Sequence, residues 1–326
     1  MSAARTGALL LIIGVVGFVA VSPNTATAAR DPFGGSGDDD AYAIDLLRRS
    51  ASAMRTTSYS GTRMVSAWGS DGATTVLVDV EHVAGQGTRL TMRGGGIPRS
   101  TATFLASGEA GTARHGELSL GALDMLTETY AVTLADADSV AGRSSTVVEV
   151  GRGGTIAARL WVDDRTGLLL RREVFDSNGR LSRESTFIDV HIDSSGFMAH
   201  LPPVAPEPGA TVVGSRRDIE NAGWDCPSQA GTLRLVGIER LEESGAVHMV
   251  YSDGLTRMSV FEQQGSLDQG SVAGFERLQV DSQVVHVREG MPTYAVWQRD
   301  GIVFTAVTDG PLDTVAGVVR AAPEHA

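Results

Sequence analysis

The sequence has a single cysteine, Cys226, among 326 residues, and it has no lysine, so all 27 basic residues are arginine. One thiol excludes an internal disulfide, a paired-cysteine redox motif and a zinc site built on cysteines. The 39 acidic residues outnumber the basic ones and give a formal net charge of −12. This charge argues against nucleic acid and against an anionic membrane surface as electrostatic partners.

Motifs of catalysis and metal binding are also missing. The sequence contains no HExxH, GxSxG, Walker A or GxGxxG pattern. The seven histidines are scattered, with no two spaced to reach one metal ion from the same strand or helix. Cys226 has no evident basic partner that would make it a reactive thiolate. We therefore expect a protein that is not an enzyme, with no catalytic residues, no cofactor and no metal.

An apolar run near the N-terminus is too short to span a bilayer in the usual way. Arg5 precedes the run Ala8–Val21, and the small triplet Ala26–Ala28 follows it. This order is typical of a secretory signal peptide, which predicts cleavage after residue 28 and a soluble, extracytoplasmic mature protein. An uncleaved anchor is the alternative, although the run falls short of the ~20 residues that a spanning helix needs. Residues 29–40 are acidic and glycine-rich and are expected to form a flexible leader.

Hydrophobic periodicity changes along the first half of the chain. Apolar residues at helical spacing in Ala41–Met54 predict an amphipathic helix, and a second, short helix is expected at Leu118–Glu128. A period of two replaces this spacing in Thr74–His82, Ile156–Asp163 and Glu184–Ile192. Such alternation indicates half-buried strands of an antiparallel sheet.

Turn and linker residues complete the predicted organisation. Four dipeptides typical of hairpin turns separate strand-like runs: Asp71-Gly72, Asn178-Gly179, Asp253-Gly254 and Asp300-Gly301. Four of the 11 prolines fall within Pro202–Pro208. Since proline lacks an N–H and stiffens the chain, residues 201–209 are predicted to link a first domain at 41–200 to a second at 210–326.

The second domain is expected to be a smaller antiparallel α+β unit. A helix at Leu312–Arg320 should close it, because Pro311 precedes a run with apolar residues on one face. The expected strands are Leu233–Leu241, Val247–Tyr251, Met258–Gln263, Gln283–Val287, Tyr294–Arg299 and Val303–Thr308. The predicted fold class is therefore mostly β, of the α+β type.

Seven short motifs lie in order on both sides of the predicted linker: Ser58–Thr62, Val140–Arg143, Arg159–Asp163, Thr166–Arg171, Asp176–Gly179, Val250–Leu255 and Ser259–Glu262. Together they resemble the MucB/RseB family, which are extracytoplasmic regulators of the sigma-E envelope-stress pathway. The resemblance implies that the first domain is lipoprotein-carrier-like. Such a domain is a curved antiparallel half-barrel sheet wrapped over helices, with an apolar cavity.

The implied cavity would be lined by residues on the apolar faces of the alternating strands. The candidates are Val76, Val78, Val80, Leu160 and Val162. Alternation by itself does not distinguish the lining of a ligand cavity from an ordinary solid core. Both interpretations therefore stay open for these five side chains.

The resemblance implies a binding function. The protein would bind the extracytoplasmic segment of a membrane anti-sigma factor and modulate its proteolysis, with a lipid or acyl chain as a second partner. The alternative is a lipid or lipoprotein carrier of the cell envelope, although a simple carrier does not need the second domain. Candidates for the partner surface are Tyr251, Ser252, Asp253, Gly254 and Leu255, whose other interpretation is a plain hairpin turn.

Overall fold

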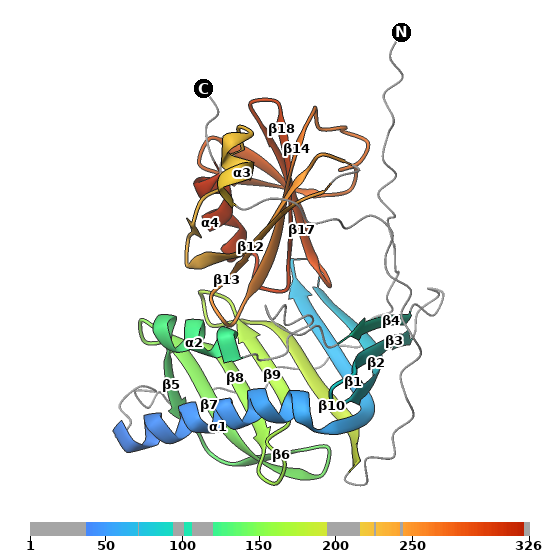
Figure 1. Cartoon of the computed structure of the whole chain (residues 1–326), viewed down its shortest axis with the longest axis vertical. Helices are drawn as coiled ribbons and strands as arrows, with labels where there is room; N and C mark the ends of the chain where they lie inside the picture. The colour runs from blue at the N-terminus through green and yellow to red at the C-terminus, as the bar shows by residue number, and fades with distance from the viewer. Residues whose placement is uncertain are drawn as a thin grey trace.

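The computed structural model describes residues 37–70, 72–93, 101–105, 120–193, 216–224, 226–241 and 244–322. These residues form two antiparallel sheets with few helices, which confirms the predicted fold class. The two sheets lie one above the other in Figure 1. The predicted signal peptide, most of the predicted leader and the predicted linker fall outside the described residues, so their bounds stay predictions.

The first sheet has ten strands in the order β4-β3-β2-β1-β10-β9-β8-β7-β5, with β6 paired to β7. The strands are β1 (Ser58–Gly69), β2 (Gly72–Val83), β3 (Gly87–Arg93), β4 (Thr101–Leu105), β5 (Ala131–Leu134), β6 (Asp138–Val140), β7 (Arg143–Arg152), β8 (Thr155–Asp163), β9 (Leu169–Phe175) and β10 (Leu181–Asp193). Strands β4 and β5 end the order and do not pair with each other, so the curved sheet is an open half-barrel.

Two helices cover the inner face of this sheet. They are α1 (Gly37–Thr56), which contacts β5, β8 and α2, and α2 (Leu120–Thr129). Helix α1 begins four residues before the start that its periodicity predicts, because Asp38, Asp39 and Asp40 form its first turn. Carboxylates favour that position, where the positive end of the helix dipole lies. The acidic end of the expected leader is therefore helical.

The β8–β9 turn shows how one side chain shapes the first sheet. The Asp163 carboxylate is almost fully buried and accepts two hydrogen bonds from Arg143, at 2.6 and 3.0 Å. It also accepts the backbone N–H and the hydroxyl of Thr166, at 2.8 and 2.7 Å. Burial alone would raise the pKa of Asp163, but these hydrogen bonds outweigh burial and lower it.

The second sheet has eight strands in the order β11-β12-β13-β14-β18-β17-β16-β15. The strands are β11 (Gln229–Ala230), β12 (Leu233–Arg240), β13 (Val247–Ser252), β14 (Arg257–Gln264), β15 (Glu276–Val280), β16 (Gln283–Arg288), β17 (Thr293–Arg299) and β18 (Ile302–Thr308). All six expected strands are confirmed. The turn at Asp300-Gly301 has positive φ at both residues, 49° and 76°, as a type I′ turn requires.

Helices α3 (Arg216–Asn221) and α4 (Asp313–Ala321) lie on one side of the second sheet (Figure 1). The expected C-terminal helix is thus confirmed, whereas α3, β11 and β15 were not predicted. Buried residues of α4, Val315, Val318 and Val319, belong to the same apolar core as the sheet. In that core Trp297 stacks on Phe304 with ring centroids 5.1 Å apart.

Candidate binding site at the domain junction

The five cavity candidates come together on the inner face of the first sheet. Val78, Val80, Leu160 and Val162 are buried, and half-buried Val76 packs against them. They join residues of α1 and α2 in one contiguous apolar core. The structure therefore groups the five residues as the alternation suggests, while their role as the lining of a ligand cavity stays a prediction.

The inner face is unevenly covered. Under α1 and α2 the strand residues Val148, Val150 and Ala158 are completely buried. On β1, β2, β3 and β10, a group that we call the wing, the core is bounded by half-buried apolar side chains. These are Val65, Val76, Leu90, Val190 and Ile192.

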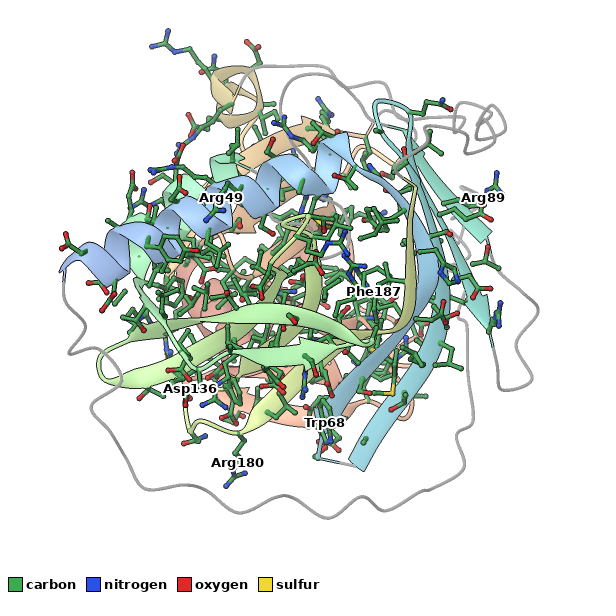
Figure 2. The ribbon with its side chains drawn as sticks, turned by 90° about the horizontal axis from the view of Figure 1, so that it is seen from below. Arg49, Trp68, Arg89, Asp136, Arg180 and Phe187 are labelled. Atoms are coloured by element: carbon green, nitrogen blue, oxygen red, sulfur yellow. The ribbon has the colours of Figure 1, made fainter. Side chains whose placement is uncertain are left out.

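Aromatic side chains extend this face deeper into the half-barrel. Figure 2 looks into the half-barrel and shows Phe187 of β10 inside its curve, while Arg89 and Arg180 point outward. Phe187 is buried, lies edge-on to Tyr59 and carries the Arg63 guanidinium 4.2 Å from its ring centroid. The wing thus has half-buried apolar side chains over buried aromatic rings, with the Arg63 guanidinium against one of them.

The five partner-surface candidates lie at the end of β13 and in the turn to β14. The structure places this turn against the first domain, where Asp253 is 2% exposed and Leu255 is 8% exposed, whereas Tyr251 is buried in the core of the second domain. Leu255 belongs to the apolar core of the first domain, although its own strands form the second sheet. The surface that the turn would offer to another protein is therefore occupied by α2 and β9 of the same chain.

We call residues 252–256 the docking loop. Its shape is fixed from within, because Asp253 Oδ1 accepts the backbone N–H groups of Leu255 and Thr256 at 3.0 and 2.7 Å. Gly254 has a φ of 88°, and a Cβ there would lie 2.1 Å from the carbonyl oxygen of Ala122 on α2. Only glycine lets the two backbones approach so closely in this conformation.

Polar groups of the first domain surround the docking loop. The Tyr130 hydroxyl donates to Asp253 Oδ2 at 2.6 Å, and Arg172 Nη2 donates to the carbonyl oxygen of Leu255. Burial raises the pKa of Tyr130 far above its usual range, and the Asp253 carboxylate raises it further. The phenol is therefore neutral and stays a hydrogen-bond donor at every physiological pH.

Two arginines on the inner face cross the junction. Arg172 Nη1 lies 3.9 Å from an Asp309 carboxylate oxygen, and Arg183 Nη2 donates to Thr293 Oγ1 at 2.9 Å. Burial lowers the pKa of Arg183, and Asp309 opposes that shift through its charge. Both guanidinium groups thus connect the half-barrel to residues of the second domain.

The junction is also closed at its rim. The β1–β2 turn reaches the second domain, where the Ser70 hydroxyl donates to Glu276 at 2.7 Å and the Ser70 N–H donates to Glu289 at 3.2 Å. The Ser177 N–H donates to Asp313 at the start of α4, at 2.8 Å. Arg234 pairs with Glu128 in solvent. Each domain therefore extends a hairpin onto the other, as Figure 1 shows for β1–β2 and β13–β14.

Sequence reasoning missed most of the groups that hold the loop. Arg172 and Arg183 stand in strands as ordinary alternating residues, and Tyr130 directly follows a short helix. No local pattern distinguishes an arginine that faces a neighbouring domain from one that faces water. The Asp253-Gly254 dipeptide was the single available signal, and it predicts the turn but not the contact.

Other kinds of site are not seen in the described part of the chain. There, no group of three or more histidine, cysteine, aspartate or glutamate side chains could hold a metal ion. A small cavity of about 10 Å³ lies between Tyr251 and Phe304, with room for one water. Among the residues described, no helix has the length and apolar character needed to cross a membrane.

Comparisons with known proteins show which family and which solved structures the chain is similar to. Residues 97–205 match the family model of the MucB/RseB N-terminal domain. The chain is similar to the crystal structure of MucB, with 22% identity and a TM-score of 0.52 over 87% of this chain and 98% of that one. It is also similar to a chain in the complex structure of Pseudomonas aeruginosa MucA/MucB, with 20% identity and a TM-score of 0.51 over 87% and 100%.

A third similar structure is MucB in complex with MucA(peri), at 22% identity and a TM-score of 0.50 over 87% of this chain and 100% of that one. A comparison with curated protein sequences finds no match. Identities at this level show a shared fold, which here spans both sheets. The family model matches from before β4 to beyond β10, so over this part the chain is similar to the MucB/RseB N-terminal domain, and the shared fold extends the likeness to both sheets.

Proposed function

We propose that the protein binds the extracytoplasmic segment of a membrane anti-sigma factor and slows its proteolysis. The carrying observation is that both domains, docked through the loop at 252–256, share the fold of MucB, which has been solved in complex with MucA(peri). A protease needs an accessible segment, so a bound regulator lowers the cleavable fraction in proportion to its occupancy. The role is binding outside the cytoplasm, without catalysis.

We place the segment on the wing. Four of the seven large apolar side chains that are well exposed in the described residues lie on its strands: Trp68, Leu77, Met92 and Ile188. Met92 pairs with Val78 of the inner face, whereas Leu77, the neighbouring residue of β2, lies on the other face, so both faces of the wing carry exposed apolar side chains that can take part in an interaction. The net charge of −12 favours a segment with a neutral or basic face, because like charges slow association.

The experiment is a capture from membranes followed by protease protection of the captured segment. The wild-type protein should retain an anti-sigma factor and slow its cleavage. Leu77→Asp should weaken both effects, whereas Val236→Asp, which alters a comparably exposed side chain on β12, should not. Cleavage at the same rate with and without the wild-type protein would refute the proposal.

Binding of a lipid or acyl chain is the second candidate function. The half-buried apolar side chains of the wing favour it. Val65, Val76 and Leu90 pack against the edge of the core and are only partly covered by other residues. Each methylene buried there would contribute roughly 0.8 kcal/mol. Native mass spectrometry after mild extraction should show bound lipid, and an apo mass with no uptake of a fluorescent fatty acid would favour a solid core.

A further inference from the structure

The apolar core of the first domain contains one side chain from the second domain. Leu255 reaches it across the junction, in a cluster that includes Leu123 and Leu126 of α2. The loop lies directly on that helix, since a Cβ at Gly254 would be 2.4 Å from the backbone nitrogen of Leu126. Removing the second domain from this position would therefore uncover apolar surface at α2.

The other contacts across the junction, among the residues described, are polar, and they range from buried to exposed. They are hydrogen bonds and ion pairs, and the Arg234–Glu128 pair is more than half exposed at both side chains. Exposed ion pairs contribute little net stability. Polar interfaces between domains of one chain allow relative motion as the normal case. The docking loop is therefore held by one apolar side chain and by polar contacts, of which the bond to buried Asp253 is shielded and the Arg234–Glu128 pair is exposed.

The loop is preorganised for this place. The Ser252 hydroxyl donates to the Thr256 carbonyl oxygen at 2.9 Å and accepts the Gly254 N–H at 3.1 Å. Together with the Asp253 hydrogen bonds, these contacts keep the loop shape without help from the first domain. Such a loop can leave its position and return to it without refolding, so docking behaves as an equilibrium between two states.

We infer that the docking loop is a removable plug of the half-barrel. When the second domain is docked, Leu255 occupies the end of the apolar core beside α2; when it undocks, that end opens to an apolar ligand. A ligand in the half-barrel and the docked second domain then compete for one space, and each weakens the other. The inference rests on the second candidate function, and it does not require binding of an anti-sigma factor.

A reversible covalent lock tests this coupling within one variant. A Cβ at Gly69 would lie 2.9 Å from Cβ of Glu289 across the junction, closer than the roughly 3.8 Å of a disulfide, so the two backbones must move slightly apart for the bridge to form. The double variant Gly69→Cys/Glu289→Cys should therefore lock the domains when it is oxidised and release them when it is reduced. Native Cys226 is buried and stays in place.

The readout is the rate at which a fluorescent long-chain fatty acid enters the protein. The oxidised variant should take up the probe about tenfold more slowly than the reduced one, or more slowly still. Leu255→Ser, which removes the plug in the full chain, should take it up faster than wild type, and Val236→Ser should not change the rate. Circular dichroism verifies that each variant is folded.

Two results would overturn the inference, and they differ in meaning. Equal uptake by the oxidised and reduced forms would show that docking does not gate the half-barrel, while ligand binding itself would stand. No uptake by either form or by Leu255→Ser would show that the half-barrel binds no such ligand, and it would refute the second candidate function. Neither result bears on the capture of an anti-sigma factor.

Discussion

The two domains close their apolar cores in different ways. The second domain uses its own C-terminal helix, whose Val315, Val318 and Val319 complete the core around the Trp297–Phe304 stack. The first domain relies on α1 and α2 and on Leu255, which comes from the other sheet. One core is therefore self-sufficient, whereas the other is complete only when the domains are docked. A protein built in this way can open one end without unfolding.

The largest effect should come from breaking the self-sufficient core. Trp297→Ala removes a fully buried ring and should lower the free energy of unfolding by about 3–5 kcal/mol. Because the docking loop belongs to that domain, the variant should also expose the first core, measured as increased binding of an apolar dye. Val236→Ala, at a half-exposed site, should stay within about 0.5 kcal/mol of wild type. A stable, docked Trp297→Ala protein would contradict the comparison.

A smaller effect should come from Gly254→Ala, which acts at the contact itself. The added methyl group meets the Ala122 carbonyl oxygen and must also tolerate a φ of 88°, so docking should weaken by about 1–3 kcal/mol. Gly301→Ala is the matched control, because it has a φ of 76° with no atom within 4 Å. Small-angle scattering should show a more open average shape for Gly254→Ala alone. Equal behaviour of the two variants would mean that strain, and not the close approach, matters.

Tyr130→Phe should cost less, about 1 kcal/mol, because it removes one hydrogen bond to Asp253 and leaves two others in place. Limited proteolysis should show somewhat faster cutting between the domains. A double-mutant cycle with Asp253→Asn measures how much of the loss belongs to the pair. Additive effects of the two substitutions would mean that the Tyr130 hydroxyl and the Asp253 carboxylate do not stabilise docking through their hydrogen bond.

The smallest expected effect is a pH dependence of stability that arises at His82, away from the junction. His82 is buried, stacks on Tyr59 at 5.0 Å and shares a 2.8 Å hydrogen bond with Thr88. Burial lowers the pKa of His82 below 6.5, with the Arg55 backbone carbonyl opposing the shift. The imidazole therefore binds a proton more readily in the unfolded chain than in the folded protein. As a result, the contribution of His82 to the free energy of unfolding is highest above about pH 6.5 and decreases as the pH falls below that value.

Urea unfolding of wild type and His82→Phe at about pH 8 and pH 5 measures this contribution. The wild-type protein should lose more stability than the variant on acidification. The exposed His191 is the matched control, and His191→Phe should keep the wild-type pH dependence. Identical pH profiles for wild type and His82→Phe would show that the buried imidazole has no such role.

The alternation of Thr74–His82 predicted a strand correctly because one face of β2 is buried and the other is more exposed. Ile156–Asp163 is also a strand, although its last four residues are all buried. The Asp300-Gly301 dipeptide predicted its turn because φ is a local property. Short or irregular elements such as β6 and β11 gave no such signal, since two or three residues do not establish a period. The 12-residue β1 and the 10-residue β7 were not predicted either, so a long strand is found from the sequence only where its apolar residues alternate regularly.

The candidate site was less readable. Asp253 and Gly254 could be placed in a turn, but their contact with Ala122 and Tyr130 joins residues that are more than 100 positions apart. Periodicity describes which face of a strand is apolar and does not say which domain covers it. The cavity candidates were grouped correctly because their alternation shows that they share one apolar face. Their function stays open because a valine that fills a solid core gives the same pattern as a valine that lines a ligand cavity.

The pairing of β1 has a consequence for the order in which the chain is made. β1 forms one ladder with β2, its immediate successor, and another with β10, so that Thr62 and Asp189 are neighbours although 127 positions separate them. A chain that emerges N-terminus first must keep one edge of β1 open until β10 has been synthesised. An unpaired edge recruits other strands and promotes aggregation. During that interval the nascent protein should depend on a chaperone, and the dependence should end once residue 193 and the loop bearing Leu255 have emerged.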